Sequence, residues 1–494
     1  MLLSNLPALQ VVVPLVSAPI CLLLRRPGHA WACALVVSWM VLAMAVLLLR
    51  QVALEGTVSY PLGAWATPWG IEYRIDMLAA LVILVIAIIG AVVMPYARRS
   101  VIQELDDEHI GAFYTCYLLC LTGLLGIVVT GDAFNLFVFL EISSLSSYVL
   151  ISLGRDRRAL TAAFQYLVMG TIGATFILIG VGLMYMMTGT LNMADLAQRL
   201  PAVNDTRTVR VAFAFVTVGV SIKLALFPLH IWLPNAYTYA PSVVSIFLAA
   251  TATKVGVYVL LRLFFTVFGI QFSFDDMHVG DIVVWLAIAA VLTGSLVAIF
   301  QDNLKRMLAY SSVAQIGYIV LGIALATGAG ISAGIIYLFN HALIKGALFM
   351  ALGGIMLRLG SVELRDLHGL LRQMPWTVAA IIAGGLSLIG VPLTAGFISK
   401  WYLVVAALEG SYWPLAFIVL ASSLLTVIYV WRIVEATCFS APGDERPGLR
   451  EAPLSMLLPT WLLIALNLYI GVDAGVLTGL ADTAAAALVE EALP

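Results

Sequence analysis

Charged residues are scarce in this sequence. Asp, Glu, Lys and Arg make up 11% of its 494 residues, whereas 62% are hydrophobic and the mean hydropathy is +1.05. This composition excludes a soluble globular protein, and the formal net charge of −2 gives no indication of a nucleic-acid partner. Apolar runs of roughly 18 or more residues recur from end to end, unlike the short alternating segments of outer-membrane strands. We therefore predict an all-α polytopic membrane protein.

Cysteine is also rare, and its spacing does not match a metal site. The five cysteines lie in or at the edge of apolar runs, so we interpret them as small hydrophobic residues and not as redox or metal-binding groups. No motif resembles a cofactor site, and we predict no catalytic chemistry, no cofactor and no metal for the chain itself. Neither a basic region nor a small-residue cleavage site precedes the first apolar run, which predicts a retained helix.

The apolar runs predict fourteen transmembrane spans. Connection 51–74 contains prolines and a glycine that predict a short hairpin, and connections 189–207 and 440–452 are polar. The spans cover residues 7–24, 30–50, 75–96, 111–130, 133–153, 160–188, 208–236, 240–268, 280–300, 304–326, 330–357, 376–408, 412–439 and 453–472. We expect four parts: 1–110 with helices 1–3 and the extracytoplasmic loop 51–74, 111–268 with helices 4–8, 280–439 with helices 9–13, and 453–494 with helix 14 and a short tail.

The distribution of basic residues predicts the orientation. Fourteen lie on odd-numbered connections and five on the opposite side, beside the acidic stretch 274–281. Cytoplasmic loops are enriched in Lys and Arg, so we predict that both termini are extracytoplasmic and that the protein lies in the cell (inner) membrane. The fourteen are Arg25, Arg26, Arg98, Arg99, Arg155, Arg157, Arg158, Lys305, Arg306, Arg358, Arg365, Arg372, Arg446 and Arg450, and the five are Arg50, Arg74, Arg199, Arg207 and Arg210.

The five lysines are distributed differently from the twenty arginines. Only Lys305 is expected at a surface, and Arg262, late in its span, is expected to snorkel to the interface. A lysine at a helix centre costs about 2.5–3.5 kcal/mol, and a buried lysine, unlike arginine, can exchange a proton near neutral pH. A single such lysine can snorkel or form a structural ion pair, but four in separate spans favour a titrating role. The four are Lys223, Lys254, Lys345 and Lys400.

One carboxylate and two histidines accompany these lysines. Glu141 lies at mid-span beside four serines, and we expect it to pair with one of the lysines. A purely structural pair, with serines that only pack helices, is the alternative. His341 and Lys345 are four residues apart and share a helix face, and His230 follows Lys223 by seven residues. A histidine at mid-depth suits proton transfer, and a core histidine with satisfied hydrogen bonds is the alternative for both.

Prolines interrupt two of the spans beside a lysine. In the seventh span Pro228 follows Lys223. In the twelfth, Pro392 precedes Lys400 and is expected to free the carbonyl of Leu388. Broken helices at membrane depth border protein or water-filled cavities, and paired interruptions indicate inverted repeats with an ion site at mid-depth. One kink alone is weak support, but two kinks beside lysines predict a hydrated row of exchangeable groups.

Four stretches resemble the antiporter-like subunits shared by respiratory complex I, membrane-bound hydrogenases and Mrp cation/proton antiporters. They are GDAFNLFVFLE, KLALFPLHIWLPNAYTYAPSVVSIFLAATATKVGVYVLLR, NLKRMLAYSSVAQIGY and FNHALIKGALFM. The resemblance covers about residues 75–440 and implies fourteen helices, with spans four to eight and nine to thirteen as two inverted five-helix repeats and helices 7 and 12 broken. It implies functional roles for one glutamate and three lysines, which match Glu141, Lys223, Lys254 and Lys400.

The stretch GDAFNLFVFLE is most similar to the D-type subunit of Mrp antiporters, and Lys400 in place of a glutamate argues against the middle complex I subunit. The resemblance implies a proton-translocating membrane subunit of a multisubunit monovalent cation (Na⁺ or K⁺)/proton antiporter, with other membrane subunits as partners. The alternatives are a proton-pumping N-type subunit of an NADH dehydrogenase, or a membrane-bound hydrogenase subunit. A proton-coupled organic-solute symporter is less favoured, because the residues around both breaks offer few hydrogen-bonding groups.

These observations predict a proton route at mid-depth. Protons are expected to arrive near Lys254, His341 and Lys345, and Lys400 is expected to pass them to the opposite exit. Opening and closing of an ion pair formed by Glu141 is expected to control the transfer. The residues predicted to carry the route are Glu141, Lys223, Lys254, Lys400, His341, Lys345 and His230.

Overall fold

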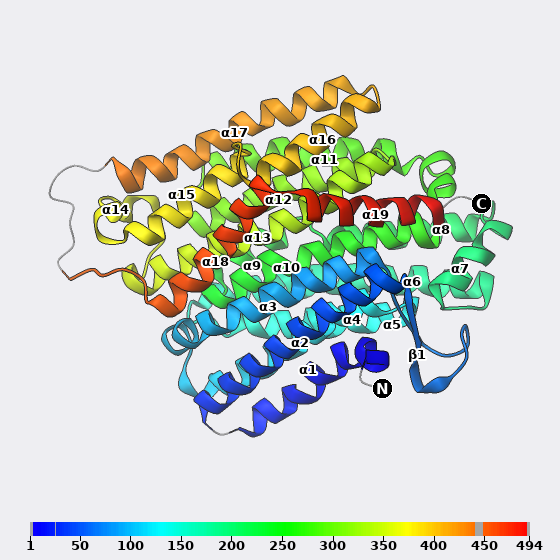
Figure 1. Ribbon diagram of the computed structural model, residues 1–494, viewed down its shortest axis with the longest axis horizontal. Helices are drawn as coiled ribbons and strands as arrows, with labels where there is room; N and C mark the ends of the chain where they lie inside the picture. Colours follow the sequence, from blue (N-terminus) through cyan, green and yellow to red (C-terminus); the bar gives the residue numbers. More distant parts are fainter. Residues whose placement is uncertain (1–2, 25, 440–447, 492–494) are drawn as a thin grey trace.

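The computed structural model describes residues 3–24, 26–439 and 448–491. Its long helices run side by side along the longest axis of the molecule (Figure 1). The two termini lie toward the same end of this bundle, as expected for an even number of passages. We call this end the acidic end and the opposite one, which holds most of the arginine-rich connections, the basic end.

The described residues contain fourteen passages through the bundle. Twelve are single helices that are each long and apolar enough to span a membrane. The other two are helix pairs with a break, α8 (Arg207–Lys223) with α9 (Trp232–Tyr239) and α15 (Pro375–Ile389) with α16 (Ala395–Glu409). The predicted spans and both predicted breaks are therefore confirmed. The twelve are α1 (Leu6–Leu23), α2 (Pro27–Glu55), α3 (Met77–Glu104), α4 (Ile110–Val129), α5 (Ala133–Ser152), α6 (Arg157–Thr188), α10 (Ser242–Leu261), α11 (Val279–Ile299), α12 (Leu304–Ala324), α13 (Gly328–Leu359), α17 (Trp413–Cys438) and α18 (Leu454–Val472).

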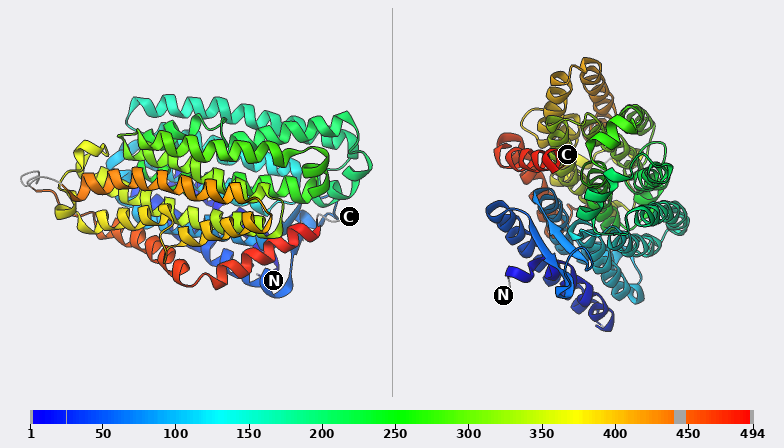
Figure 2. Two further views of the ribbon diagram at one scale, coloured as in Figure 1. Left: turned by 90° about the horizontal axis from the view of Figure 1, so that it is seen from above. Right: turned by 90° about the vertical axis from the view of Figure 1, so that its right-hand side faces the viewer.

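The end-on view shows how the passages are distributed. Helices α1 and α2 lie at one edge of the bundle and α17 at the opposite edge (Figure 2). Between them, α3, α10, α12 and α13 are largely buried, because they pack against other helices on most sides. These central helices carry three of the five lysines, Lys254, Lys305 and Lys345, and all three are buried inside the bundle.

The connections at the acidic end are structured. Strands β1 (Val58–Pro61) and β2 (Glu72–Ile75) pair antiparallel, with Val58 opposite Ile75, which confirms the predicted hairpin. Short 3₁₀ or π segments and two short α-helices complete the connections at both ends. These are η1 (Leu3–Asn5), η2 (Leu62–Ala64), η3 (Asp107–His109), α7 (Met193–Arg199), η4 (Leu200–Ala202), η5 (Arg262–Val267), η6 (Gln271–Asp276), η7 (Leu364–Asp366) and α14 (Leu370–Gln373).

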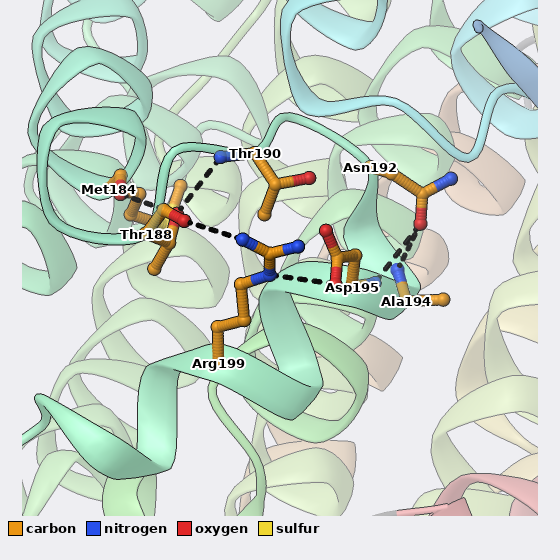
Figure 3. Close-up of polar contacts among 7 residues, drawn as sticks. All are labelled: Met184, Thr188, Thr190, Asn192, Ala194, Asp195 and Arg199. Carbon is orange, nitrogen blue, oxygen red and sulfur yellow. Dashed lines mark hydrogen bonds and ion pairs between the residues drawn. The ribbon is translucent and has the colours of Figure 1, made fainter. Parts of the chain in front are cut away.

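Asn192, the N-cap residue of α7, attaches the polar connection after α6 to the hairpin. Asn192 caps α7 by accepting hydrogen bonds from the two backbone amides of Ala194 and Asp195, both at 3.0 Å (Figure 3). Arg199 Nε lies 2.9 Å from Asp195 Oδ1, one helical turn away. The Asn192 side chain also donates a 2.8 Å hydrogen bond to Glu72 Oε2 on β2. This hydrogen bond joins the N-terminus of α7 to the hairpin.

The residues after α18 form a helix, α19 (Gly475–Glu491), where we expected only a short tail. It follows α18 at an angle and packs against α13 and α3 (Figure 1). Its alanines explain the helix, since alanine has the highest helix propensity and Ala481, Ala484 and Ala485 are buried. Asp482 and Thr483 interrupt the apolar run, which is why hydropathy did not indicate a further helix.

Candidate functional site

Glu141 and Lys223 form the ion pair that the sequence predicts. Glu141 lies almost halfway along α5, and Lys223 is the last residue of α8. Lys223 Nζ is 3.5 Å from Glu141 Oε1 and donates a 2.8 Å hydrogen bond to Ser144 Oγ. The Lys223 side chain is 6% exposed and the Glu141 side chain 25%. The lysine is therefore enclosed, whereas the glutamate side chain is partly exposed although its Oε1 is buried.

The seventh passage breaks directly after Lys223. Residues 224–231 form turns, and the indole Nε1 of Trp232 donates a 3.0 Å hydrogen bond to the carbonyl of Ile222 at the broken end. Gly256 on α10 permits the close approach of these turns, because a Cβ at this position would lie 2.8 Å from Leu224 Cβ. The break therefore rests directly on the helix that carries Lys254.

Lys254 lies in the centre of the bundle without an acidic partner. Its side chain is buried on α10, and its Nζ donates hydrogen bonds to the Ala249 carbonyl and, at 3.4 Å, to Thr253 Oγ1. The described residues place no carboxylate within ion-pair distance of this group. Neutral oxygens therefore hold Lys254, and they can accept a hydrogen bond from either the amine or the ammonium form.

His341 and Lys345 lie one turn apart on α13, and both are fully buried. Lys345 Nζ donates to the Leu308 carbonyl at 2.8 Å and to the Ser311 hydroxyl, both on α12. Both ring nitrogens of His341 are buried without a hydrogen-bond partner among the described residues. Helix α10, which carries Lys254, packs against α13. We call Lys254, His341 and Lys345 the central cluster.

Lys400 binds the broken end of the twelfth passage. Its Nζ donates to the Leu388 carbonyl at 3.1 Å, to the Ile389 carbonyl at 2.8 Å and to Ser423 Oγ at 2.9 Å, and it lies 5.2 Å from the ring centroid of Tyr318. The structure thus confirms that the break frees the Leu388 carbonyl, and it shows that the nearby lysine occupies that acceptor.

His230 lies in the break between α8 and α9, half-buried. Its ring stacks on Phe227 with centroids 5.3 Å apart and meets the edge of Tyr310 at 6.4 Å. The seven-residue spacing from Lys223 does not place the two on one helix face, because α8 ends at Lys223. The structure therefore does not bring His230 into the central cluster.

Lys305 is buried, which corrects the expectation that it lies at a surface. Only 4% of the residue is exposed, and its Nζ donates to the Ala240 carbonyl at 3.3 Å and to Ser242 Oγ at 3.1 Å. The Glu104 carboxylate accepts a 2.7 Å hydrogen bond from the backbone N–H of the same Ser242. Lys305 lies near the start of α12, where neighbouring helix ends cover it, and sequence spacing alone does not reveal this covering.

A cavity at the basic end reaches Lys305 and Glu104. Its volume is about 530 Å³, and its walls come from the ends of α3, α9, α12 and α13 and from the α5–α6 connection. Leu308 and Ser311, which bind Lys345, follow Lys305 on α12, and six residues of helix rise about 9 Å. Helix α12 therefore connects the cavity wall at Lys305 with the groups that bind Lys345.

Arg262 does not snorkel, contrary to our expectation. Its guanidinium forms an ion pair with Asp76, the N-cap of α3, and both side chains are nearly buried. Burial opposes ionisation of Asp76, but the charge of the Arg262 guanidinium outweighs it and holds the pKa of that carboxyl below its usual value. The residues are 186 positions apart, so no local pattern indicates the pair.

The chain is similar to known membrane proteins along most of its length. Residues 130–426 match the family described as NADH:quinone oxidoreductase/Mrp antiporter, TM. The chain is 43% identical to NADH-quinone oxidoreductase subunit N of Desulforudis audaxviator over 93% of this chain and 94% of that protein. It is 30% identical to the D-type subunit of the Na(+)/H(+) antiporter of Alkalihalophilus pseudofirmus over 95% and 94%. A chain in the Mrp complex of Dietzia sp. DQ12-45-1b superposes with a TM-score of 0.89, at 28% identity and covering 99% of this chain and 98% of that one.

Proposed function

The chain belongs to the NADH:quinone oxidoreductase/Mrp antiporter family, and from this premise we propose that it is a proton-translocating membrane subunit of a multisubunit monovalent cation/proton antiporter that exchanges Na⁺ or K⁺. The observation that carries the proposal is the row of enclosed lysines, of which only Lys223 has a carboxylate partner among the interior sites described above. Its partners are other membrane subunits, as in the Mrp complex.

In the proposed route, protons arrive through the cavity at the basic end. Lys305 and Glu104 receive them, and α12 leads them past Ser311 to Lys345. The central cluster then exchanges them through Lys254 and His341. Because its acceptors are neutral oxygens, a lysine of this cluster can release a proton without breaking an ion pair.

The Glu141–Lys223 pair is the proposed control element. Removing one partner from a buried ion pair leaves an uncompensated charge that costs about 3–5 kcal/mol. Withdrawal of the partly exposed Glu141 carboxylate therefore favours the release of the Lys223 proton. Lys400, held on the opposite broken passage, is proposed to pass the proton to the exit, and this correspondence of the two breaks supports inverted repeats over 111–268 and 280–439.

We also propose the orientation. The basic end carries the excess of Lys and Arg, so the positive-inside rule places it in the cytoplasm and both termini outside it. Protons then enter the cavity from the cytoplasmic side of the cell (inner) membrane. Single cysteines at Arg157 and Arg207, which lie at opposite ends, test this assignment. The measurement is their labelling in everted vesicles by a thiol reagent that does not cross the membrane.

A second candidate is a proton-pumping subunit of an NADH dehydrogenase, or of a membrane-bound hydrogenase. The 43% identity to an N-type subunit favours it. The same lysines serve both functions, so the partner subunits distinguish them. Purification of the native assembly would recover small antiporter subunits in the first case and redox subunits in the second. An organic-solute symporter is disfavoured, because the apolar hollow beside Leu388 measures only about 10 Å³, roughly the space of one water.

Proton transport by the Glu141 and Lys223 variants tests the proposal. The whole complex carrying Glu141→Ala or Lys223→Ala would be assayed in everted vesicles by the collapse of a pH gradient on addition of Na⁺ or K⁺. We expect both variants to lose most of the activity. Glu55→Ala is the control, because this glutamate is exposed at the end of α2, where its side chain accepts a hydrogen bond from Gln51 of the same helix. Undiminished activity in both test variants would remove the proposed roles.

A further inference from the structure

A second hollow at the basic end lies on the outside of the bundle, apart from the proton route. It measures about 470 Å³ and lies between the start of α2, the end of α3 and the start of α18. Its position at the helix ends is the depth at which lipid headgroups meet a membrane protein. The hollow is lined by Trp31, Pro95, Arg98, Arg99, Ile102 and Ser455.

The guanidinium N–H groups of the two arginines in this hollow are available to bind a ligand. Arg98 and Arg99 are exposed, and neither forms an ion pair with an acidic side chain in the part of the chain that the structure describes. The Arg98 guanidinium lies over the Trp31 ring, 4.8 Å from its centroid. Trp31 is itself fixed, because its Nε1 donates a 2.9 Å hydrogen bond to the Met94 carbonyl. The hollow therefore presents two adjacent positive charges on a rigid aromatic wall.

Two other arginines at the basic end differ in this respect. Arg155 lies 3.3 Å from Asp106, and Arg158 lies 2.7 Å from Asp156. Their positive charge is therefore neutralised locally. Charge complementarity consequently selects an anionic occupant for the hollow at Arg98 and Arg99, and not for the neighbouring connection between α5 and α6.

An apolar strip continues from the hollow along α3. This helix lies between α2 and α18 (Figure 1). Ile102 is 54% exposed, and Pro95, Ile88 and Leu84 follow at helical spacings of seven, seven and four residues and are partly exposed. On α18, Leu454 is 72% exposed. The surface next to the arginines therefore suits hydrocarbon chains.

From this combination we propose that the hollow binds an anionic phospholipid, with its phosphate between Arg98 and Arg99 and its acyl chains along the strip of α3. The Ser455 hydroxyl supplies a further donor at the rim. Basic pockets between transmembrane helices on the cytoplasmic side are suited to lipid phosphates. Free phosphate would use the arginines alone, whereas a lipid also uses the apolar strip.

Native mass spectrometry of the purified full-length protein tests the site. The protein would be titrated with dioleoyl phosphatidylglycerol, with dioleoyl phosphatidylcholine as the neutral comparison. Arg98→Gln with Arg99→Gln is expected to weaken phosphatidylglycerol binding roughly 30-fold, from about 1 kcal/mol for each charge. Arg157→Gln with Arg365→Gln is the matched control, since both arginines are exposed at the same end outside the hollow, and it should retain wild-type binding.

Two further arms complete the test. Arg98→Lys with Arg99→Lys keeps both charges and is expected to retain most of the binding, and inorganic phosphate at the lipid's concentration is expected not to displace the lipid. Equal binding by the Gln pair and the wild type, or equal affinity for phosphatidylcholine, would overturn the proposal. So would a cross-link showing an acidic segment of a neighbouring subunit in the hollow. None of these readouts depends on proton transport.

Discussion

At the scale of single residues, the interior lysines differ in how their charge is balanced. Lys223 has a carboxylate 3.5 Å away, whereas Lys254, Lys345 and Lys400 are held by carbonyl and hydroxyl oxygens. A neutral oxygen stabilises an ammonium less than a carboxylate does. In the proposed function, the lysines with neutral acceptors are therefore the exchange sites, and Lys223 belongs to the control element.

The Asp76–Arg262 pair gives a stability prediction. Asp76→Asn leaves the Arg262 guanidinium buried without its counterion, which should lower the free energy of unfolding by about 3–5 kcal/mol. Asp156→Asn, which breaks the exposed pair with Arg158, should cost no more than about 1 kcal/mol. The thermal midpoints of the purified variants measure the difference, and equal midpoints would contradict a structural role for the buried pair.

The same pair predicts a pH dependence. The folded-state pKa of Asp76 lies below its ordinary value, so its contribution to stability is complete above the unfolded pKa of about 3.9 and disappears as the pH falls through the folded value. The difference in thermal midpoint between wild type and Asp76→Asn should therefore be constant from about pH 5 to 8. It should shrink only below about pH 4, and a loss near pH 6 would contradict this assignment.

His341 gives a second prediction at this scale. Glutamine can form hydrogen bonds in the same space but cannot titrate, so His341→Gln should reduce proton flux at least about tenfold, which corresponds to about 1.4 kcal/mol of barrier. The flux of reconstituted complex would be measured with an internal pH dye. His230→Gln is the comparison, because His230 lies outside the central cluster, and equal losses in both would contradict the cluster.

At the scale of elements, the two breaks build the site. Each break exposes backbone carbonyls at the end of a helix, and a side chain then occupies them: Trp232 in the seventh passage and Lys400 in the twelfth. The polar backbone is thereby satisfied within the protein, which permits irregular structure at membrane depth. The breaks consequently position the lysines and do not only add flexibility.

Close packing across the second break can be tested with one methyl group. A Cβ at Gly396 would lie 1.7 Å from the Ser387 carbonyl oxygen, so Gly396→Ala should displace α16 and lower stability by about 1–3 kcal/mol. Because α16 carries Lys400, transport should fall as well. Gly479→Ala on α19 is the control, since no atom lies within 4 Å of the place that its new methyl group would occupy. A melting midpoint unchanged in both variants would refute the packing argument.

The sequence predicts the features that depend on apolar runs and on the spacing of residues along the chain. The fourteen passages follow from hydropathy, both breaks follow from prolines, and the partnership of Glu141 with a lysine follows from its being the lone interior carboxylate. The depth of Lys305 and the Asp76–Arg262 pair depend on helices that are far apart in the chain. Helix α19 was missed because Asp482 interrupts its apolar run.

At the scale of the whole molecule, the candidate site extends from the basic end to both breaks. The cavity reaches Lys305, α12 leads to the central cluster, and the breaks on either side hold Lys223 and Lys400. The Glu141 side chain is partly exposed, so in the proposed function a neighbouring subunit can influence it. In the proposed function the lysines are therefore exchange sites and not merely fixed charges.

Proton flux through the reconstituted complex carrying Lys254→Arg tests this central claim most directly. Arginine keeps the positive charge but remains protonated, so we predict a loss of at least about tenfold in a variant that assembles normally. Arg157→Lys, an exposed exchange of the opposite kind, should transport like the wild type. Wild-type flux in Lys254→Arg would show that a fixed charge suffices and would contradict proton exchange at this lysine.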